Sequence, residues 1–178
     1  MALILASTQP DTPDYNHEIH TVIVDNFGRS SKSDFIAFLP TPLENVVQAR
    51  LVSASMTTTY DVSQTAFHIG IEELRTYFTH QTQAEINFSG DDDTTNDTKN
   101  HLNGVFGTIL GNHVSLGEEN GAKVFLFRDE YPIVQCYHNP IRKLNRLTFN
   151  IDKQNGSAAS IGDSTFILRV TCRKKNLS

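Results

Sequence analysis

The chain has 178 residues, a length that suits a single domain with a hydrophobic core of its own. Its formal net charge is −5 at pH 7, and this acidic balance argues against a nucleic-acid-binding domain, which would usually be basic. No run approaches the roughly 18 apolar residues that a membrane-spanning helix needs, so we expect neither a nucleic-acid partner nor a membrane segment.

The N-terminal region is polar after Leu5 and contains two prolines. Its short apolar stretch follows no basic region and is not typical of a secretory signal peptide. We interpret residues 1–16 as an arm that is flexible in the isolated chain. A second use of the arm is to dock on a neighbouring subunit, with Leu3, Ile4 and Leu5 as the contact.

Short runs of apolar residues, separated by turn signals, predict five strands in the first half of the chain. Pro40 and Pro42 follow the second run and should end it, because proline cannot donate a hydrogen bond to a neighbouring strand. The expected strands are residues 18–25, 34–39, 46–55, 65–74 and 84–88.

An acidic stretch, SGDDDTTND at residues 89–97, raises the question of a calcium site. It fails the EF-hand pattern, because Asn96 replaces the loop glycine and Leu102 replaces the bidentate glutamate. We therefore expect a solvated loop at these residues.

Residues 98–110 are the one helical candidate. Four apolar residues recur there at helical spacing, although two glycines weaken the helix by about 1 kcal/mol each relative to alanine. The apolar residues are Leu102, Val105, Phe106 and Ile109, and the glycines are Gly104 and Gly107.

Two alternating runs near the C-terminus are the strongest strand signals. We expect Leu147, Phe149, Phe166 and Leu168, on the apolar faces of these runs, to be buried between two sheets. Asn155-Gly156 between the runs favours a turn, so we predict a long β-hairpin. Shorter strands are expected before it at residues 114–116, 123–127 and 133–137, with Pro132 as an interruption.

Eight to ten short strands with no internal repeat are typical of an all-β sandwich or barrel. An eight-stranded jelly roll fits this number. We therefore expect an all-β, single jelly-roll β-sandwich with one short helical insertion over residues 17–173. Residues 174–178 are expected to form a basic C-terminal tail.

No pattern in the sequence indicates catalysis or a bound cofactor. Glu72 and Glu73 occupy consecutive positions of an expected strand, so their carboxylates should face opposite sides and share no proton. The seven histidines show neither HxH nor HExxH spacing, and GxSxG, GxGxxG and phosphate-loop motifs are absent from the sequence. We expect no catalytic, cofactor-binding or metal-binding residues. The histidines are His17, His20, His68, His80, His101, His113 and His138.

Five aromatic residues could form a sugar-binding platform, but without tryptophan we favour core packing or a subunit interface for them. They are Tyr60, Tyr77, Phe78, Tyr131 and Tyr137. The two cysteines, Cys136 and Cys172, form no metal motif and lie on separate expected strands. We expect free thiols, and the sequence leaves open whether the two are bridged.

Two segments near the ends of the expected domain together resemble a family of viral shell proteins. SDFIAFLPTPLENVVQARLVSASM is similar to the opening pattern of small capsid proteins of large icosahedral double-stranded DNA viruses. NPIRKLNRLTFNIDKQNGS and DSTFILRVTC are similar to their closing pattern. Asn145 departs from the aspartate that is common before Arg-Leu, and Met56-Thr57 replaces a frequent proline-containing turn. The matching residues are Phe35, Leu39, Pro40, Pro42, Asn45, Val46, Leu51, Ser53, Leu144, Arg146, Leu147, Thr148, Asp152, Gly156, Phe166 and Leu168.

The resemblance implies a single jelly-roll penton protein that forms the five-fold vertex ring of a virion. Its partners would be itself, as a homopentamer, and neighbouring major and minor capsid proteins, with assembly inside the host cell. On this resemblance we expect a structural protein and not an enzyme. The alternatives are a minor capsid protein on the inner face of the shell, a carbohydrate- or receptor-binding jelly roll, and a cupin-like enzyme.

Overall fold

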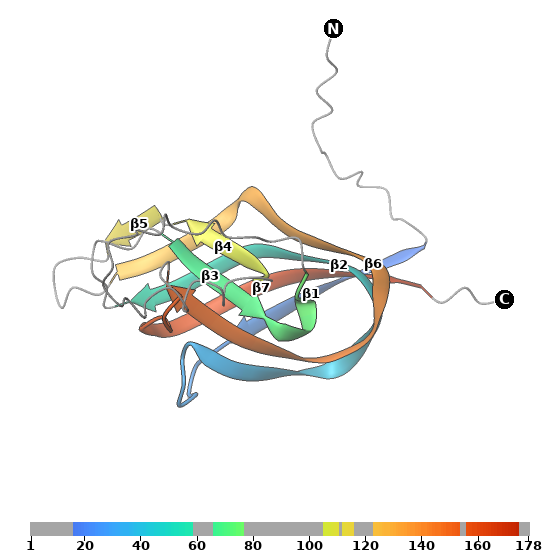
Figure 1. The fold of residues 1–178 in the computed structure, drawn as a ribbon, viewed down its shortest axis with the longest axis horizontal. Coiled ribbons are helices and arrows are strands. Elements are labelled where there is room, and N and C mark those ends of the chain that lie inside the picture. The colour runs from blue at the N-terminus through green and yellow to red at the C-terminus, as the bar shows by residue number, and fades with distance from the viewer. Residues whose placement is uncertain are drawn as a thin grey trace, which may run out of the picture.

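A computed structural model describes residues 16–58, 66–76, 105–110, 112–115, 123–153 and 156–174 of the chain. These residues form seven strands and one turn of 3-10 helix, η1 (Figure 1). The elements are β1 (His17–Asp25), β2 (Asp34–Thr58), β3 (Ala66–Ile71), η1 (Glu72–Leu74), β4 (Gly107–Leu110), β5 (Asn112–Ser115), β6 (Lys123–Lys153) and β7 (Ile161–Arg173).

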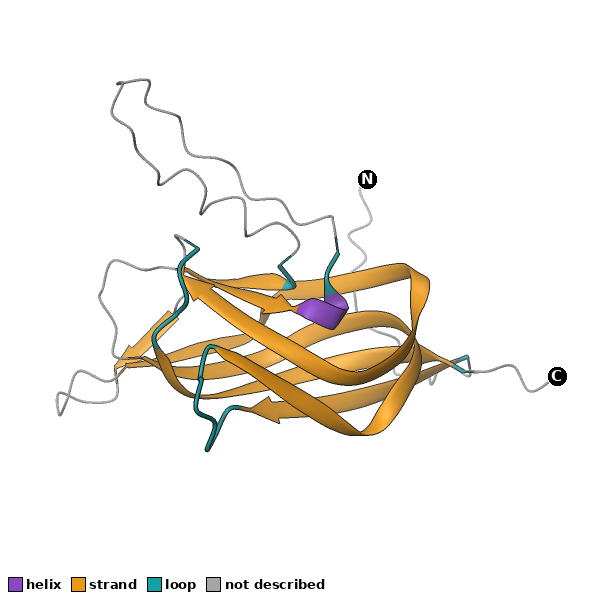
Figure 2. Cartoon of the chain, turned by 60° about the horizontal axis from the view of Figure 1, so that its bottom comes forward, coloured by secondary structure: helices purple, strands orange, loops and turns teal. Residues whose placement is uncertain are grey.

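All seven strands belong to one antiparallel sheet with the order β1-β7-β2-β6-β3-β4, and β5 pairs with β6 beside this path. The sheet curls over on itself (Figure 2). The expected all-β class is confirmed for the described residues. Among them, no helix has the length and apolar character needed to cross a membrane.

Two strands extend through both halves of the molecule, since β2 has 25 residues and β6 has 31. Residues 34–38 of β2 pair with residues 146–150 of β6, and residues 48–58 pair with the segment 123–136. The register shifts between these two stretches, so each strand bends where its pairing is interrupted.

The prolines of β2 lie in this bend and do not end the strand, contrary to the sequence-based expectation. Pro40 and Pro42 are exposed and fall in the gap between the paired residues Phe38 and Leu43. A proline removes a donor, but its fixed φ is compatible with extended backbone, so the chain continues as a strand without the local ladder. β6 likewise runs through Pro132, but its ladder with β2 skips from Arg128 to Ile133, so the predicted interruption affects the pairing and does not end the strand.

The bends divide the sheet into two layers. One layer contains β1, β7, residues 46–58 of β2 and the first part of β6. The other contains residues 34–38 of β2, the last part of β6, β3 and β4. Aromatic rings from the two layers meet in the core. The ring centroids of Phe149 on β6 and Phe166 on β7 are 5.0 Å apart.

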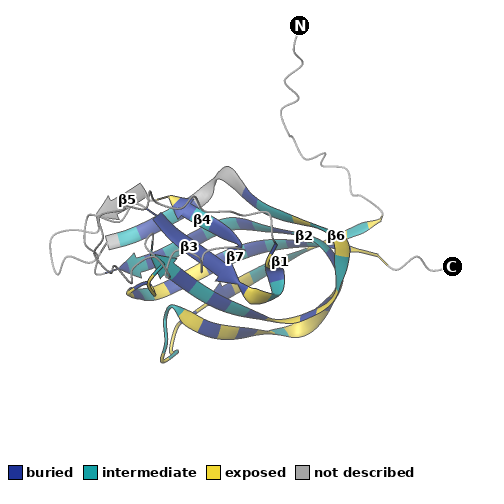
Figure 3. Ribbon diagram, viewed as in Figure 1, coloured by how far each residue is buried: buried dark blue, intermediate teal, exposed yellow. Residues whose placement is uncertain are grey.

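The predicted core of the two C-terminal runs is confirmed. Leu147, Phe166 and Leu168 are 0% exposed and Phe149 is 1% exposed. Buried residues alternate with less buried ones along β6 and β7, as the colouring in Figure 3 shows. The apolar faces of the two runs therefore pack against each other between the layers.

The predicted β-hairpin between these runs is wrong. A turn forms at Gly156, where φ is 82° and the N–H donates to the Lys153 carbonyl over 2.9 Å. However, β7 then crosses to the other layer and pairs with β1 and β2. Alternation identifies a strand and its buried face, but the partner strand depends on segments far away in the sequence.

The predicted helix at residues 98–110 is wrong over its last residues, which form β4 and pair with β3. Ile109 lies opposite Phe67 in this ladder and is fully buried. Val105 and Phe106 are buried and belong to no helix or strand. Residues 98–104 lie outside the described residues, as do the arm up to residue 15, the strand expected at 84–88 and the acidic loop at 89–97. The short strand expected at 114–116 is found two residues earlier, as β5.

Replacing Phe166 by alanine should lower the free energy of unfolding by about 3–5 kcal/mol, because it opens a cavity between the layers. Chemical denaturation would measure this loss. Thr165→Ala, one residue earlier on the exposed face, is the matched control and should cost less than about 1 kcal/mol. Equal losses for the two variants would contradict the assigned faces.

Replacing Gly107 by alanine should cost about 1–3 kcal/mol, because a Cβ at this position would overlap the side chain of Ile133 on β6. Adding Ile133→Ala removes the atoms that clash. In denaturant unfolding, the cost of Gly107→Ala should therefore be smaller in the Ile133→Ala background. Strict additivity of the two losses would show that the contact is not the cause.

Candidate interaction surface

The two layers leave two free sheet edges on one side of the molecule. Within the described chain, β1 pairs only with β7, and residues 34–38 of β2 pair only with β6. The Arg29 guanidinium group bridges the two edges at one end, where it donates to the Asp25 and Ile36 carbonyls. These two edges line a common groove of about 330 Å³. Its walls are mostly apolar, with Val24 and Ala37 buried at its base and Phe38 at its rim.

Exposed apolar side chains gather at the same edges. Five of the six large hydrophobic residues that are exposed in the described chain lie on β1, on the turn after it, or on the start of β2. We call these five the apolar edge. Phe38 is 74% exposed, although phenylalanine usually lies inside a protein, so this edge has the character of an interaction surface. The residues are Ile19, Ile23, Phe27, Ile36 and Phe38.

The turn between β1 and β2 is held rigidly by Asn26, which is fully buried. Its Oδ1 accepts a hydrogen bond from the Ser164 N–H over 2.8 Å, and its Nδ2 donates to the Lys32 and Gly162 carbonyls. The Lys32 ammonium group in turn lies 2.7 Å from the Asp163 carboxylate. The apolar edge is therefore presented by a fixed backbone that is anchored to β7.

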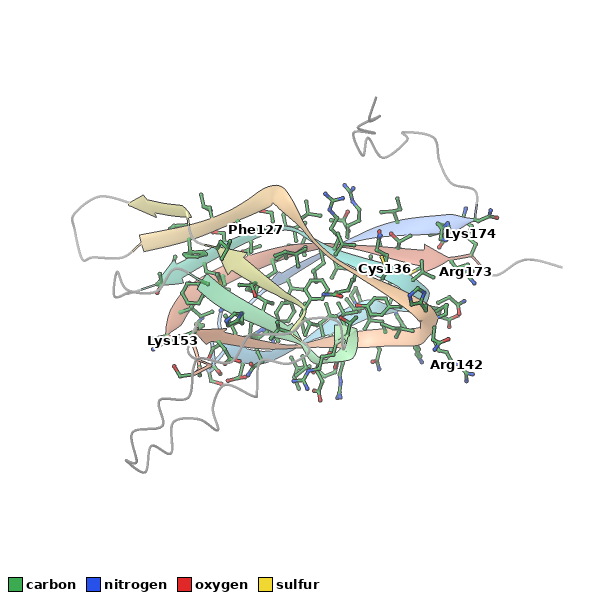
Figure 4. The ribbon with its side chains drawn as sticks, turned by 45° about the horizontal axis from the view of Figure 1, so that its top comes forward. Phe127, Cys136, Arg142, Lys153, Arg173 and Lys174 are labelled. Atoms are coloured by element: carbon green, nitrogen blue, oxygen red, sulfur yellow. The ribbon has the colours of Figure 1, made fainter. Side chains whose placement is uncertain are left out.

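A second hollow, of about 740 Å³, lies at the end of the groove that is away from the turn between β1 and β2. It is lined by Glu18, by residues 41–45 and by the end of β7. The two hollows share His20, Thr41 and Leu43, so they adjoin along the free edges, and we call the two together the channel. We call the end that contains Arg173 and Lys174 the mouth of the channel. Both residues are exposed and lie where β7 ends beside β1 (Figure 4).

A separate polar cluster fixes the turn that follows β3. Glu73 lies on η1 and not on a strand as expected, and its carboxylate receives three hydrogen bonds from β6. The donors are the Arg146 Nε at 3.0 Å, the Thr148 N–H at 2.7 Å and the Thr148 hydroxyl at 2.8 Å. Arg146 and Thr148 belong to the capsid-like pattern, so these two residues of the pattern have a structural role here.

Two further side chains of β6 hold the same region. The Tyr137 hydroxyl donates to the Leu74 carbonyl over 3.0 Å, and the Gln135 amide donates to the Phe106 carbonyl over 2.9 Å. Thr76 donates to the Gln135 side-chain oxygen over 2.7 Å. The two segments that flank residues 77–104 are therefore both hydrogen-bonded to side chains of β6.

Tyr137 is the one residue of the proposed aromatic platform whose side chain the structure describes, and it is half-buried against the core. Burial raises the pKa of the Tyr137 hydroxyl, and the Cys136 thiol beside it adds to this rise. The hydroxyl therefore remains a neutral donor to Leu74. Tyr60, Tyr77 and Phe78 lie outside the described residues, and the Tyr131 side chain is outside the described part of β6.

The two cysteines are free, and the possible bridge between them is not formed. Cys136 on β6 is exposed and Cys172 on β7 is buried, with β2 between the two strands (Figure 4). Burial raises the pKa of the Cys172 thiol, and the Glu18 carboxylate raises it further, so this thiol stays protonated at neutral pH.

The described histidines lie apart from one another on several strands. His68 on β3 is buried, with its Nδ1 2.9 Å from the Thr108 hydroxyl of β4. His17 and His20 lie on β1, while His138 is exposed on β6. In the part of the chain that the structure describes, no three histidine, cysteine or acidic residues could hold a metal ion together. His80 and His101 lie outside that part, as does the side chain of His113.

The stabilising effect of Glu73 should depend on pH. Burial alone would raise the pKa of this carboxyl, but the hydrogen bonds from Thr148 and Arg146 outweigh burial and hold it below the ordinary value of 4.5. A lowered pKa in the folded state stabilises the fold above pH 4.5, and this contribution is lost as the pH falls through the folded-state pKa.

Glu73→Gln should therefore reduce the free energy of unfolding by about 1 kcal/mol at neutral pH and by less in acid. Denaturant unfolding as a function of pH would measure the difference. Glu72→Gln, on the same turn but with an exposed side chain, is the control. A loss for Glu73→Gln that is the same at acid and neutral pH would contradict this role of the carboxylate.

Comparisons with known proteins leave the family of this chain open. No protein-family model matches the sequence, and no curated protein matches it.

Proposed function

We propose that the chain is a jelly-roll subunit of an icosahedral virus shell, most specifically the penton protein of the five-fold vertex. The observation that carries this proposal is the order of its strands. If the two halves of β2 and of β6 are counted separately, the two layers contain eight segments, with β5 as an addition beside β6.

In chain order, one layer then holds the first, eighth, third and sixth segments, and the other holds the second, seventh, fourth and fifth. A double-sheet arrangement of eight strands built from two Greek keys is a jelly roll, which occurs in viral capsid and lectin domains and in cupins. This order supports the fold that the end segments suggested, and the known uses of that fold include the function classes that the sequence left open.

The surfaces favour assembly among these classes. The apolar edge leaves aromatic and branched side chains in water on a rigid backbone, next to two free strand edges. Natural proteins generally cover such edges, because an exposed one invites pairing with another chain. A shell subunit would cover the apolar edge against its neighbour. In a five-fold ring each copy contacts the next through two different surfaces, so one such edge per copy is sufficient.

A carbohydrate-binding module is the second candidate, and one observation favours it. The outer face of the β3 layer contains a polar hollow of about 670 Å³. Asp34, Glu72, Asn150 and Asp152 contribute acceptors or donors to its lining, and Arg75 contributes a cation. A glycan array would test this candidate, with Asn150→Ala as the variant that should remove binding. Binding of a defined sugar through this hollow would favour the module over the shell subunit.

The shell function is tested by reconstruction of the virus particle at a resolution that traces side chains. We expect five copies around each five-fold axis, with the apolar edge of every copy buried against the next. Each contact should bury on the order of 1,000 Å² or more in total, the range of specific interfaces. A position on the inner face of the shell would replace the penton assignment with a minor capsid protein. Absence from the particle would reject both.

A further inference from the structure

The channel along the free edges is a site for one more strand. Its two walls are the outer edges of β1 and of the first part of β2, each with one partner strand in the described chain. Backbone donors and acceptors of an edge strand can pair with an extended segment, and pockets between alternate side chains select its sequence. Because Val22 and Leu39 line the channel as well, the added segment should carry apolar residues on the face that points inward.

The N-terminal segment of the chain has this chemistry. Residues 3–9, LILASTQ, contain no charge and no proline, and they begin with the apolar run Leu3-Ile4-Leu5. In an extended strand, Leu3 and Leu5 share one face and Ile4 lies on the other. The first pair fits the buried side of the channel, and Ile4 fits beside the exposed Ile23.

Charge at the mouth of the channel fits the next part of the same segment. Residues 10–15, PDTPDY, carry Asp11 and Asp14, and they join the domain at Asn16. The Asn16 carbonyl accepts a hydrogen bond from the Lys174 N–H over 2.9 Å, so the segment leaves the domain at the mouth. Arg173 and Lys174 line this mouth together with Glu18 and Glu44, and they are the two cations that these carboxylates would meet there.

The length of the segment allows it to reach a neighbouring copy. Fifteen residues extend to about 50 Å, whereas the part of β1 from Glu18 to Val24 is about 20 Å long. Pro10 and Pro13 favour an extended path away from the domain over a reversal along its own β1. We infer that residues 3–9 of one copy add as a strand to the free edge of β1 in a second copy and lie beside Ile23 and Phe38, which line the groove. This inference rests on the proposed function, which places copies side by side.

Binding of a labelled peptide to the purified full chain tests the inference. The peptide contains residues 1–15, and the protein carries Leu3→Asp and Leu5→Asp so that its own segment does not compete. We expect saturable binding by fluorescence anisotropy. Phe38→Asp in the protein should weaken it at least about tenfold. Leu110→Asp, which changes a residue that is 60% exposed on β4 away from the channel, should leave it unchanged.

A peptide that carries the same two aspartates should not bind. Absence of binding by the unmodified peptide would overturn the inference, as would equal effects of Phe38→Asp and Leu110→Asp. The binding measurements with the peptide and with the protein variants use purified protein and no virus particle. The inference can therefore fail while the chain is still found at a vertex, and it can hold while the chain is absent from the shell.

Cross-linking decides whether the segment comes from a second copy. Ile4→Cys and Ile23→Cys are introduced together with Cys136→Ser, which removes the exposed native thiol. Equal amounts of ¹⁴N- and ¹⁵N-labelled protein are mixed at high concentration and oxidised mildly, and mass spectrometry identifies the linked peptides. Mixed-isotope links between residues 4 and 23 are expected. Links within one isotope alone would show that the segment folds onto its own chain. That result would overturn the exchange between copies, as would the absence of any link.

Discussion

The two-layered fold depends on the antiparallel ladder between β2 and β6, because each of these strands contributes one half to each layer. A bend in one strand has to be matched by a bend in the other, and both bends fall where the ladder is interrupted. The interruption coincides with Pro40 and Pro42, which cannot donate to a neighbouring strand. Asn45, with a φ of 55°, lies just after them and completes the change of direction. Turning the sheet over in this way encloses a single core between its two halves.

The same bend explains why two edges remain open on one side. A sheet that folds over at β2 and β6 places β1 at the end of one layer and the start of β2 at the edge of the other. The two edges do not pair with each other as strands, although Arg29 bridges them at the Asp25 and Ile36 carbonyls, and the groove lies between them. The buried hydrogen bonds of Asn26 connect the two edges through the turn between them, so the opening has a defined shape. A defined opening with apolar walls is a surface on which an extended segment or another protein can pack.

The capsid-like pattern also gains a physical meaning from the fold. Arg146 and Thr148 point their polar groups at Glu73, while Leu147 between them is buried in the core. This tripeptide therefore couples one strand of the sheet to the turn that precedes residues 77–104.

The sequence by itself determined the all-β class, the positions of most strands and the buried faces of β6 and β7. These follow from local alternation, because side chains of period two can bury only one face of a strand. It did not determine which strands pair. The two C-terminal runs looked like a hairpin, and only the tertiary structure placed them in opposite layers. Likewise, the spacing of Val105, Phe106 and Ile109 predicted a helix, and pairing with β3 placed Ile109 on a strand instead. A contact through Leu3 to Leu5 stays a prediction from the sequence. The channel could not be predicted, because its walls are joined only when distant segments of the chain meet.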